Sequence, residues 1–372
     1  MYENEIKIIK LSSKPMVNQE ILYKINDLCK KEINWGYIFY IMLHHRVTAI
    51  VYDNLEKSGS LKYIEKHVRR AMKTECIRIL EKNTLFLQEI NKINTILEQK
   101  AIFFVNIKGA SFLQRLYPYI NYREFTDIDY LIKKEDISVV TKCLNDVGYI
   151  QGEYDFITNT IRPYSRKEII EKIINSHECA EFVRLSNSQF FSSFIVDINY
   201  SIIWQEYYNK RDEKNKVVLS NQRDVFSING INYFHLSNED ELIQLCCHLY
   251  SEAMFFLFDP FWKREQSDIS IIKLCDILLL IKKYPINWCG VRKKAILQEV
   301  VEPVCYSLDC VERFYDDLEL PFNVHQFFDC ELPKETLIDK YYDKNFNVRF
   351  WECSYEDRLF DMKKKLVEIN SL

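Results

Sequence analysis

Hydrophobic and polar positions follow different periods in three regions of the chain. In residues 1–95, apolar side chains recur every three or four positions, which is the period of amphipathic helices. Near residue 100 the pattern changes to short runs of β-branched and aromatic residues, which are typical of strands. The helical period returns from about residue 206. We therefore predict a strand-containing core at 96–205, between an N-terminal helical region at 1–95 and a mostly helical C-terminal domain at 206–372.

The predicted core combines short strands with short helices. Its strands are expected at 101–107, 127–133, 178–185 and 193–200, and its helices at 110–117 and 135–147. In the C-terminal region, the dipeptide Asn229-Gly230 between two β-favouring runs predicts a hairpin. The fold class indicated by the whole pattern is α+β, a small mixed β-sheet flanked by helical regions on both sides.

Composition narrows the class of protein. The 372 residues are 48% hydrophobic and 28% charged, as in an ordinary globular protein, and the net charge of −4 argues against a broadly basic nucleic-acid coat. The 12 cysteines contain no CxxC pair, so Cys143, Cys246 and Cys275 are interpreted as core residues of a reduced protein. No apolar run reaches the roughly 18 residues of a membrane span, and the N-terminus has no signal pattern. We expect a cytoplasmic protein with no membrane partner.

The pair Asp127 and Asp129 is the most informative chemical feature. On a strand, alternate residues share a face, so both carboxylates would point the same way, about 7 Å apart. Divalent cations with oxygen ligands suit such a pair. The pair alone is weak, because 54 acidic residues in this chain would produce roughly eight acid-x-acid pairs by chance. Such a pair, taken alone, is interpreted as two solvated carboxylates at the end of a strand.

Two further features accompany the pair. A turn at Lys108 and Gly109 leads from a predicted strand into a helix, where glycine allows close approach of a phosphate and Ser111 offers a hydroxyl. Asp197 lies within a second apolar strand and needs a cation or hydrogen bonds if it is buried. Each feature also has a purely structural interpretation. Lys108 and Gly109 can form a simple strand-to-helix turn, and Asp197 can be an acid at the sheet edge that faces water. Their order along the chain is the layout of a two-metal nucleotidyl-transfer site.

Residues 100–205 resemble the core of the nucleotidyltransferase superfamily, with its strand, hG[GS] turn, helix, hDhDh strand and later hDh strand. The segment KGASFLQRLYPYINYREFTDIDYLI resembles more closely a poorly characterised bacterial nucleotidyltransferase-like family marked by a KGa…lY…R…sDiDlLv signature. Trp35 and Trp288 resemble that family's flanking helical regions. The chain departs from the pattern at Ala110, where Gly or Ser is usual, and at Asn199, where the family has His.

The resemblance implies an enzyme that moves a nucleoside monophosphate from an NTP such as ATP to a small-molecule or peptide acceptor, releasing pyrophosphate. It implies two Mg²⁺ ions, with Mn²⁺ as a substitute, and assigns metal binding and catalysis to Asp127, Asp129 and Asp197. Nucleotide binding is assigned to Lys108, Gly109, Ser111 and Arg123, although Arg123 also has the alternative of pairing with Asp127. Two alternatives stay open: a toxin-like nucleotidyltransferase acting on tRNA or a protein side chain, and an inactive nucleotide- or peptide-binding scaffold.

Three further residues are candidates for the acceptor cleft. His177 begins a predicted strand, and Lys273 and Asp276 lie three apart on a predicted C-terminal helix. Their structural interpretations are a hydrogen-bonded histidine and a surface ion pair. The sequence has no P-loop, GxGxxG or HExxH motif, so P-loop kinases, dehydrogenases and zinc proteases lack their signatures here.

Overall fold

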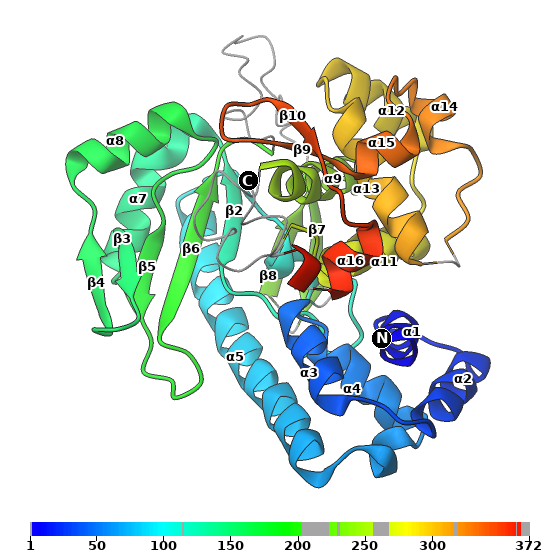
Figure 1. The fold of residues 1–372 in the computed structure, drawn as a ribbon. Coiled ribbons are helices and arrows are strands. Elements are labelled where there is room, and N and C mark those ends of the chain that lie inside the picture. The colour runs from blue at the N-terminus through cyan, green and yellow to red at the C-terminus, as the bar shows by residue number, and fades with distance from the viewer. Residues whose placement is uncertain are drawn as a thin grey trace. The chain divides into compact units, whose positions relative to one another are not determined.

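The computed structural model describes residues 2–113, 115–202, 223–228, 231–255, 268–315, 318–361 and 363–365. The chain forms two compact units, one of residues 77–241 and one that combines residues 1–76 with 242–372 (Figure 1). The two ends of the chain, predicted as separate regions, thus belong to one unit. We describe each unit by itself.

The unit built from both ends of the chain is mostly helical. Tyr37 donates a hydrogen bond to the carbonyl oxygen of Phe360 at 2.6 Å, and a ring nitrogen of His45 lies 2.8 Å from the carbonyl oxygen of Leu359. These contacts join segments more than 300 residues apart, a separation that local sequence patterns do not reveal. Its elements are α1 (Glu3–Ser12), α2 (Gln19–Cys29), α3 (Trp35–His44), α4 (Thr48–Lys57), η1 (Ser60–Tyr63), α9 (Asn238–Phe255) from residue 242 onward, α11 (Ile271–Lys283), α12 (Trp288–Leu297), α13 (Val301–Phe314), α14 (Val324–Phe328), α15 (Lys334–Ile338), β9 (Lys340–Tyr342), β10 (Val348–Phe350) and α16 (Tyr355–Phe360).

The unit of residues 77–241 contains a six-stranded mixed sheet, so the predicted α+β class is confirmed. The strand order is β1-β2-β6-β5-β3-β4, in which β2 and β6 are parallel and the other neighbours antiparallel. The strands are β1 (Phe104–Asn106), β2 (Ile128–Ile132), β3 (Ile150–Asp155), β4 (Thr160–Pro163), β5 (Phe182–Leu185) and β6 (Ser193–Asn199). The helices between them are α6 (Gly109–Phe112), α7 (Ile137–Asp146) and α8 (Arg166–Asn175), with η2 (Lys134–Asp136) before α7.

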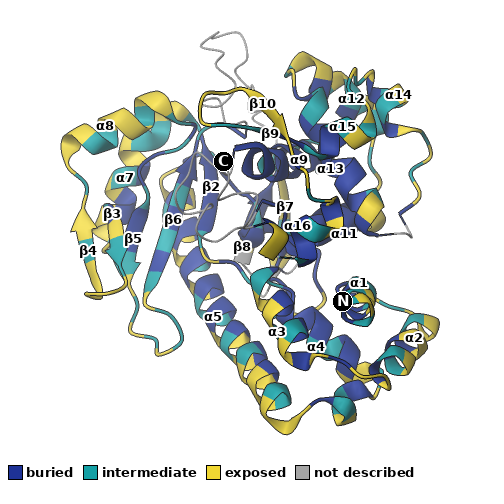
Figure 2. Cartoon of the chain, in the orientation of Figure 1, coloured by how far each residue is buried: buried dark blue, intermediate teal, exposed yellow. Residues whose placement is uncertain are grey.

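One face of this sheet packs against α5 (Lys66–Gln99), whose residues from 77 onward belong to this unit. The hydroxyl of Tyr130 on β2 donates to the side-chain oxygen of Asn94 at 2.8 Å. The rings of Phe86 on α5 and Phe194 on β6 lie 5.2 Å apart. All of β2 and most of β6 are buried (Figure 2). Because side chains alternate along a strand, the neighbours of Tyr130 and Phe194 point to the opposite face.

Several elements differ from the prediction. The expected hairpin exists as β7 (Asp224–Ile228) paired with β8 (Ile231–His235), but it belongs to the sheet unit rather than to the C-terminal region. Its turn, Asn229-Gly230, lies outside the described residues. The helix expected at 110–117 is the four-residue α6. Residues 150–175, for which no element was predicted, form β3, β4 and α8.

The remaining expectations concern cysteines and helices. Cys143, Cys246 and Cys275 are buried and free, as predicted for core residues. Lys273 forms an ion pair with Glu252, so its charge is used within the helical unit. In the part of the chain that the structure describes, no helix combines the length and apolar character needed to span a bilayer.

Candidate functional site

Two acids lie side by side on the sheet face opposite α5. In the parallel pairing of β2 and β6, Asp129 stands beside Asp197, so their backbones are about 4.8 Å apart and their side chains share a face. Asp129 is 2% exposed, whereas Asp197 is partly exposed. Asp127 lies one residue before β2 and is also partly exposed. Strand alternation thus places the predicted acids on one face, and the register brings the third one to them.

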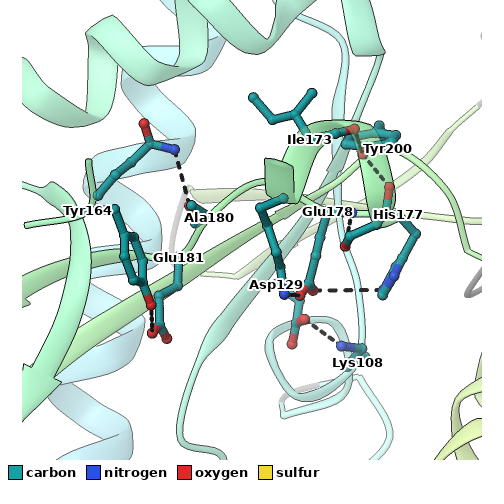
Figure 3. A network of polar contacts seen from close by, with 12 residues as sticks. Lys108, Asp129, Tyr164, Ile173, His177, Glu178, Ala180, Glu181 and Tyr200 are labelled. Atoms are coloured by element: carbon teal, nitrogen blue, oxygen red, sulfur yellow. Dashed lines mark hydrogen bonds and ion pairs between the residues drawn. The ribbon is translucent and has the colours of Figure 1, made fainter. Parts of the chain in front are cut away.

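Lys108 supplies the positive charge nearest to these acids. Its ammonium donates to Oδ1 of Asp129 at 2.6 Å (Figure 3). Burial lowers the pKa of Lys108, but Asp129, Asp127 and Asp197 together outweigh burial and raise its pKa, so the ammonium stays charged. The backbone of Lys108 has φ 53°, a conformation that L residues seldom adopt. Strain of this kind persists where surrounding contacts hold a side chain in place.

The cluster contains more negative charge than its lysine neutralises. Burial raises the pKa of Asp129 to about 6, with Asp127 and Glu178 adding to the effect and Lys108 opposing it. Burial, followed by the charge of Glu178, also raises the pKa of Asp197 well above its usual range. The charge of Lys108 opposes this rise at Asp197 but does not outweigh burial and the three neighbouring acids. A bound cation would relieve this crowding.

Glu178 belongs to the cluster and was missed by sequence reasoning. An isolated bridge pairs its backbone with Asn199 at the end of β6. Its carboxylate lies 2.8 Å from the ammonium of Lys172 on α8 and 3.7 Å from Nε2 of the buried His177 (Figure 3). His177 is therefore near the acids, as its candidate role requires. The sequence signal for Glu178 is an acid at the start of a predicted strand, next to the candidate His177.

A cavity of about 590 Å³ opens beside Asp197. Its wall comes from α8, from the segment that precedes β5 and from β6. Tyr164 and Glu181 lie on this wall, joined by a hydrogen bond of 3.0 Å (Figure 3). The capping box of Ser165 and Glu168 at the start of α8 was readable from the sequence as S-x-x-E before an apolar run. That pattern indicates the start of the helix whose residues line the cavity.

The structure places the other expected nucleotide contacts differently. Ser111 has no exposed surface, and its hydroxyl donates to Oε1 of Glu241 at 2.8 Å. Gly109 is buried, and a Cβ atom there would lie 2.6 Å from the Cβ of Phe125. The left-handed backbone occurs at Lys108 rather than at this glycine, so tight packing explains Gly109. The hydroxyl of Ser111, expected to contact phosphate, makes a buried hydrogen bond to Glu241 in this structure.

Arg123 is buried, and its guanidinium donates to the carbonyl oxygen of Glu124 at 2.5 Å. The backbone carbonyl of Arg123 in turn accepts a hydrogen bond from Asn83 on α5. These contacts tie the loop before β2 to the helix behind the sheet. Lys108, another of the four expected nucleotide contacts, forms a direct ion pair with Asp129.

The acids suit a hard cation by their chemistry. In the segments described, no three Asp, Glu, His or Cys side chains are already arranged as a metal site, and Lys108 occupies one oxygen of Asp129. The available donors are nevertheless carboxylate oxygens, crowded together and short of positive charge, which is the ligand type that Mg²⁺ prefers. Asp127, Asp129 and Asp197 therefore fit a divalent cation.

Comparison with known proteins gives one match. The model of a family described as "Uncharacterised nucleotidyltransferase" matches residues 31–316, which include the whole cluster and most of both units. No curated protein and no solved structure matches the chain.

Proposed function

The chain belongs to this uncharacterised nucleotidyltransferase family, and on this premise we propose that it transfers a nucleoside monophosphate from an NTP to an acceptor with release of pyrophosphate. The observation that carries the proposal is the pairing of Asp129 with Asp197 on adjacent strands, beside Asp127 and Lys108. We assign Mg²⁺ binding to the three aspartates, with Mn²⁺ as a substitute. When bound, the metal neutralises the triphosphate and lowers the pKa of the acceptor hydroxyl.

The chain's own residues divide the remaining work. Asp197 lines the cavity, and burial with three neighbouring acids raises its pKa, so its carboxylate is in position to take the proton of the acceptor hydroxyl. The acceptor oxygen then bonds to the α-phosphorus, while the bond from that phosphorus to the oxygen of pyrophosphate breaks. Lys108, charged and held beside Asp129, would bind phosphate oxygens of the NTP.

The first test asks whether nucleotide binding needs the paired acids. Wild-type protein should melt at a higher temperature when Mg²⁺ and an NTP are both present. The double variant Asp127→Asn/Asp129→Asn should lose this shift and keep its fold, because amides preserve size but not charge. Asp146→Asn, an exposed change on α7, is the matched control and should keep the shift. A wild-type shift in the double variant would refute the site.

Turnover and acceptor are measured on the same preparations. Mass spectrometry after incubation with Mg²⁺ and each of the four NTPs would detect a nucleotide added to small molecules, peptides, tRNA or the protein itself. We expect pyrophosphate release that depends on the acceptor. A protein that binds NTP but releases no pyrophosphate with any of these acceptor classes would instead be a nucleotide-binding scaffold.

A further inference from the structure

Two cysteines of the helical unit lie in contact beside a second cavity. Cys305 is fully buried on α13, and Cys330 is half-buried between α14 and α15, the two short helices that pack against α13 (Figure 1). The two thiols form a hydrogen bond with each other. Cys330 also lines a cavity of about 500 Å³, so a small molecule can reach this thiol, whereas Cys305 has no exposed surface.

Other hydrogen bonds hold the two cysteines together. Nε2 of His325 on α14 pairs with Oδ2 of Asp309 at 2.5 Å, and Asp309 lies one turn after Cys305 on α13. The backbone N–H of Cys330 donates to the carbonyl oxygen of His325 at 3.0 Å. These bonds bring Cys330 to the part of α13 that contains Cys305, independently of the thiols themselves.

The surroundings make Cys330 the more reactive thiol of the pair. Its hydrogen bond with Cys305 outweighs burial. The backbone N–H of Leu332 and the charge of His325 add to this effect, and the pKa of Cys330 falls to about 7. The same bond, followed by burial, raises the pKa of Cys305. About half of Cys330 is therefore thiolate at neutral pH, and the thiolate is the form that peroxides oxidise.

We propose that Cys305 and Cys330 are an oxidation site, at which a hydroperoxide converts the two thiols into a disulfide. The Cys330 thiolate attacks one peroxide oxygen, and the O–O bond breaks to give a sulfenic acid and a reduced oxygen that takes up a proton. The sulfur of Cys305 then bonds to that of Cys330, the S–O bond breaks, and water leaves with the proton of Cys305. The peroxide gains both electrons that the thiols lose.

The position of Cys330 in the chain suits this step. A disulfide needs its sulfurs about 2.05 Å apart, closer than two hydrogen-bonded thiols. Cys330 lies in residues 329–333, outside both neighbouring helices, so a local backbone shift there closes the distance while α13 keeps its helical bonds. The accessible sulfur is thus oxidised first, and the buried sulfur protects it from further oxidation.

The test is disulfide mapping on the reduced full-length protein. Equimolar hydrogen peroxide at neutral pH, followed by alkylation and digestion without reductant, should give a linked peptide of Cys305 and Cys330 that dithiothreitol removes. Cys289, which is exposed on α12, is the internal control. It should stay a thiol at this dose, because exposure alone does not make a cysteine reactive.

Two variants separate the roles of the thiols. Cys305→Ser keeps a hydrogen-bond donor but removes the second sulfur, so we expect Cys330 to accumulate as a sulfenic acid that dimedone traps. Cys330→Ser should leave Cys305 reduced, since its sulfur is buried. The matched control Cys289→Ser should form the linked peptide as wild type does.

Three results would overturn the inference: no linkage of Cys305 to Cys330 at a peroxide dose that oxidises Cys289, linkage of Cys330 to another cysteine, or a linkage that forms only in protein that circular dichroism shows to be unfolded. The mapping on wild-type protein needs no variant, so the inference can be refuted even if a serine variant fails to fold.

Discussion

Two buried aspartates of this protein have opposite environments. In the helical unit, Asp268 is 1% exposed and accepts a hydrogen bond of 2.8 Å from Nε of Arg358 and another from Lys365. In the sheet unit, Asp129 is 2% exposed and shares Lys108 with the neighbouring acids. Burial alone would raise the pKa of both carboxyls. The two cations outweigh burial at Asp268 and lower its pKa, whereas the pKa of Asp129 rises to about 6.

We interpret Asp268 as a charge that stabilises the fold and Asp129 as a charge that is held for a ligand. Arg358 also donates to the carbonyl oxygen of Ile338 at 2.6 Å and contacts the hydroxyl of Tyr306 at 3.3 Å, so its network is complete. Around Asp129 the carboxylates outnumber the cations. This excess of negative charge lowers the free energy of unfolding until a cation binds. Groups with raised pKa values collect at functional sites for this reason.

The largest expected effect is on catalysis and concerns Asp197 in the sheet unit. Asp197→Asn should lower pyrophosphate release by about a thousandfold or more, because the acceptor hydroxyl loses a carboxylate that binds metal and takes its proton. The melting temperature without metal should stay the same or rise, since the folded state no longer has to hold a carboxyl whose ionised form burial and the neighbouring acids disfavour. Parallel melting curves and pyrophosphate assays would check both. Near-normal turnover per folded molecule would remove Asp197 from the mechanism.

The second effect is a loss of stability, whereas Asp197→Asn is expected to keep or raise the melting temperature. Asp268→Asn leaves Arg358 and Lys365 buried without their anion, so we expect the free energy of unfolding to fall by about 3 kcal/mol. Urea unfolding monitored by circular dichroism would measure it. Asp27→Asn removes a surface partner of Lys30 and should change little. If both variants unfold at the same urea concentration, the Asp268 network does not stabilise the fold as argued.

Local patterns predicted the parts of the site that depend on neighbouring residues. Alternation along 127–133 put Asp129 on the face opposite Tyr130, and the structure confirms this split, with Tyr130 bonded to Asn94 of α5. The strand at 193–200 was similarly predicted from its apolar run, and it contains Asp197. Both predictions used spacing over a few residues, which is the information that hydrophobic periodicity contains.

Pairings between distant segments were not predictable in the same way. Glu178 reaches the cluster because its backbone pairs with the end of β6, and Ser111 is buried by a contact with Glu241, 130 residues away. Neither contact leaves a local signature, because each depends on which strands and helices become neighbours. The shared unit of the two chain ends is a third example. The helix α8 is different, since the local pattern Ser165-x-x-Glu168 before an apolar run indicates where it begins.

The smallest expected effect is on the pH dependence of stability, which should differ between Asp129 and Asp268. Asp129 has a folded pKa of about 6, above the value of about 4 of an unfolded aspartate, so the folded state binds more protons between these values. Stability from this group is therefore present below pH 4 and lost as pH rises to about 6, a change on the order of 2–3 kcal/mol. Asp268 has a lowered folded pKa, so its contribution is present above about pH 4 and lost as pH falls further.

Urea unfolding of wild type, Asp129→Asn and Asp268→Asn in a chelating buffer would measure both contributions. The stability gained by Asp129→Asn over wild type should grow from pH 4 to pH 6, and the deficit of Asp268→Asn should shrink below pH 4. Parallel pH profiles for all three proteins would show that the two aspartates do not differ as the structure indicates.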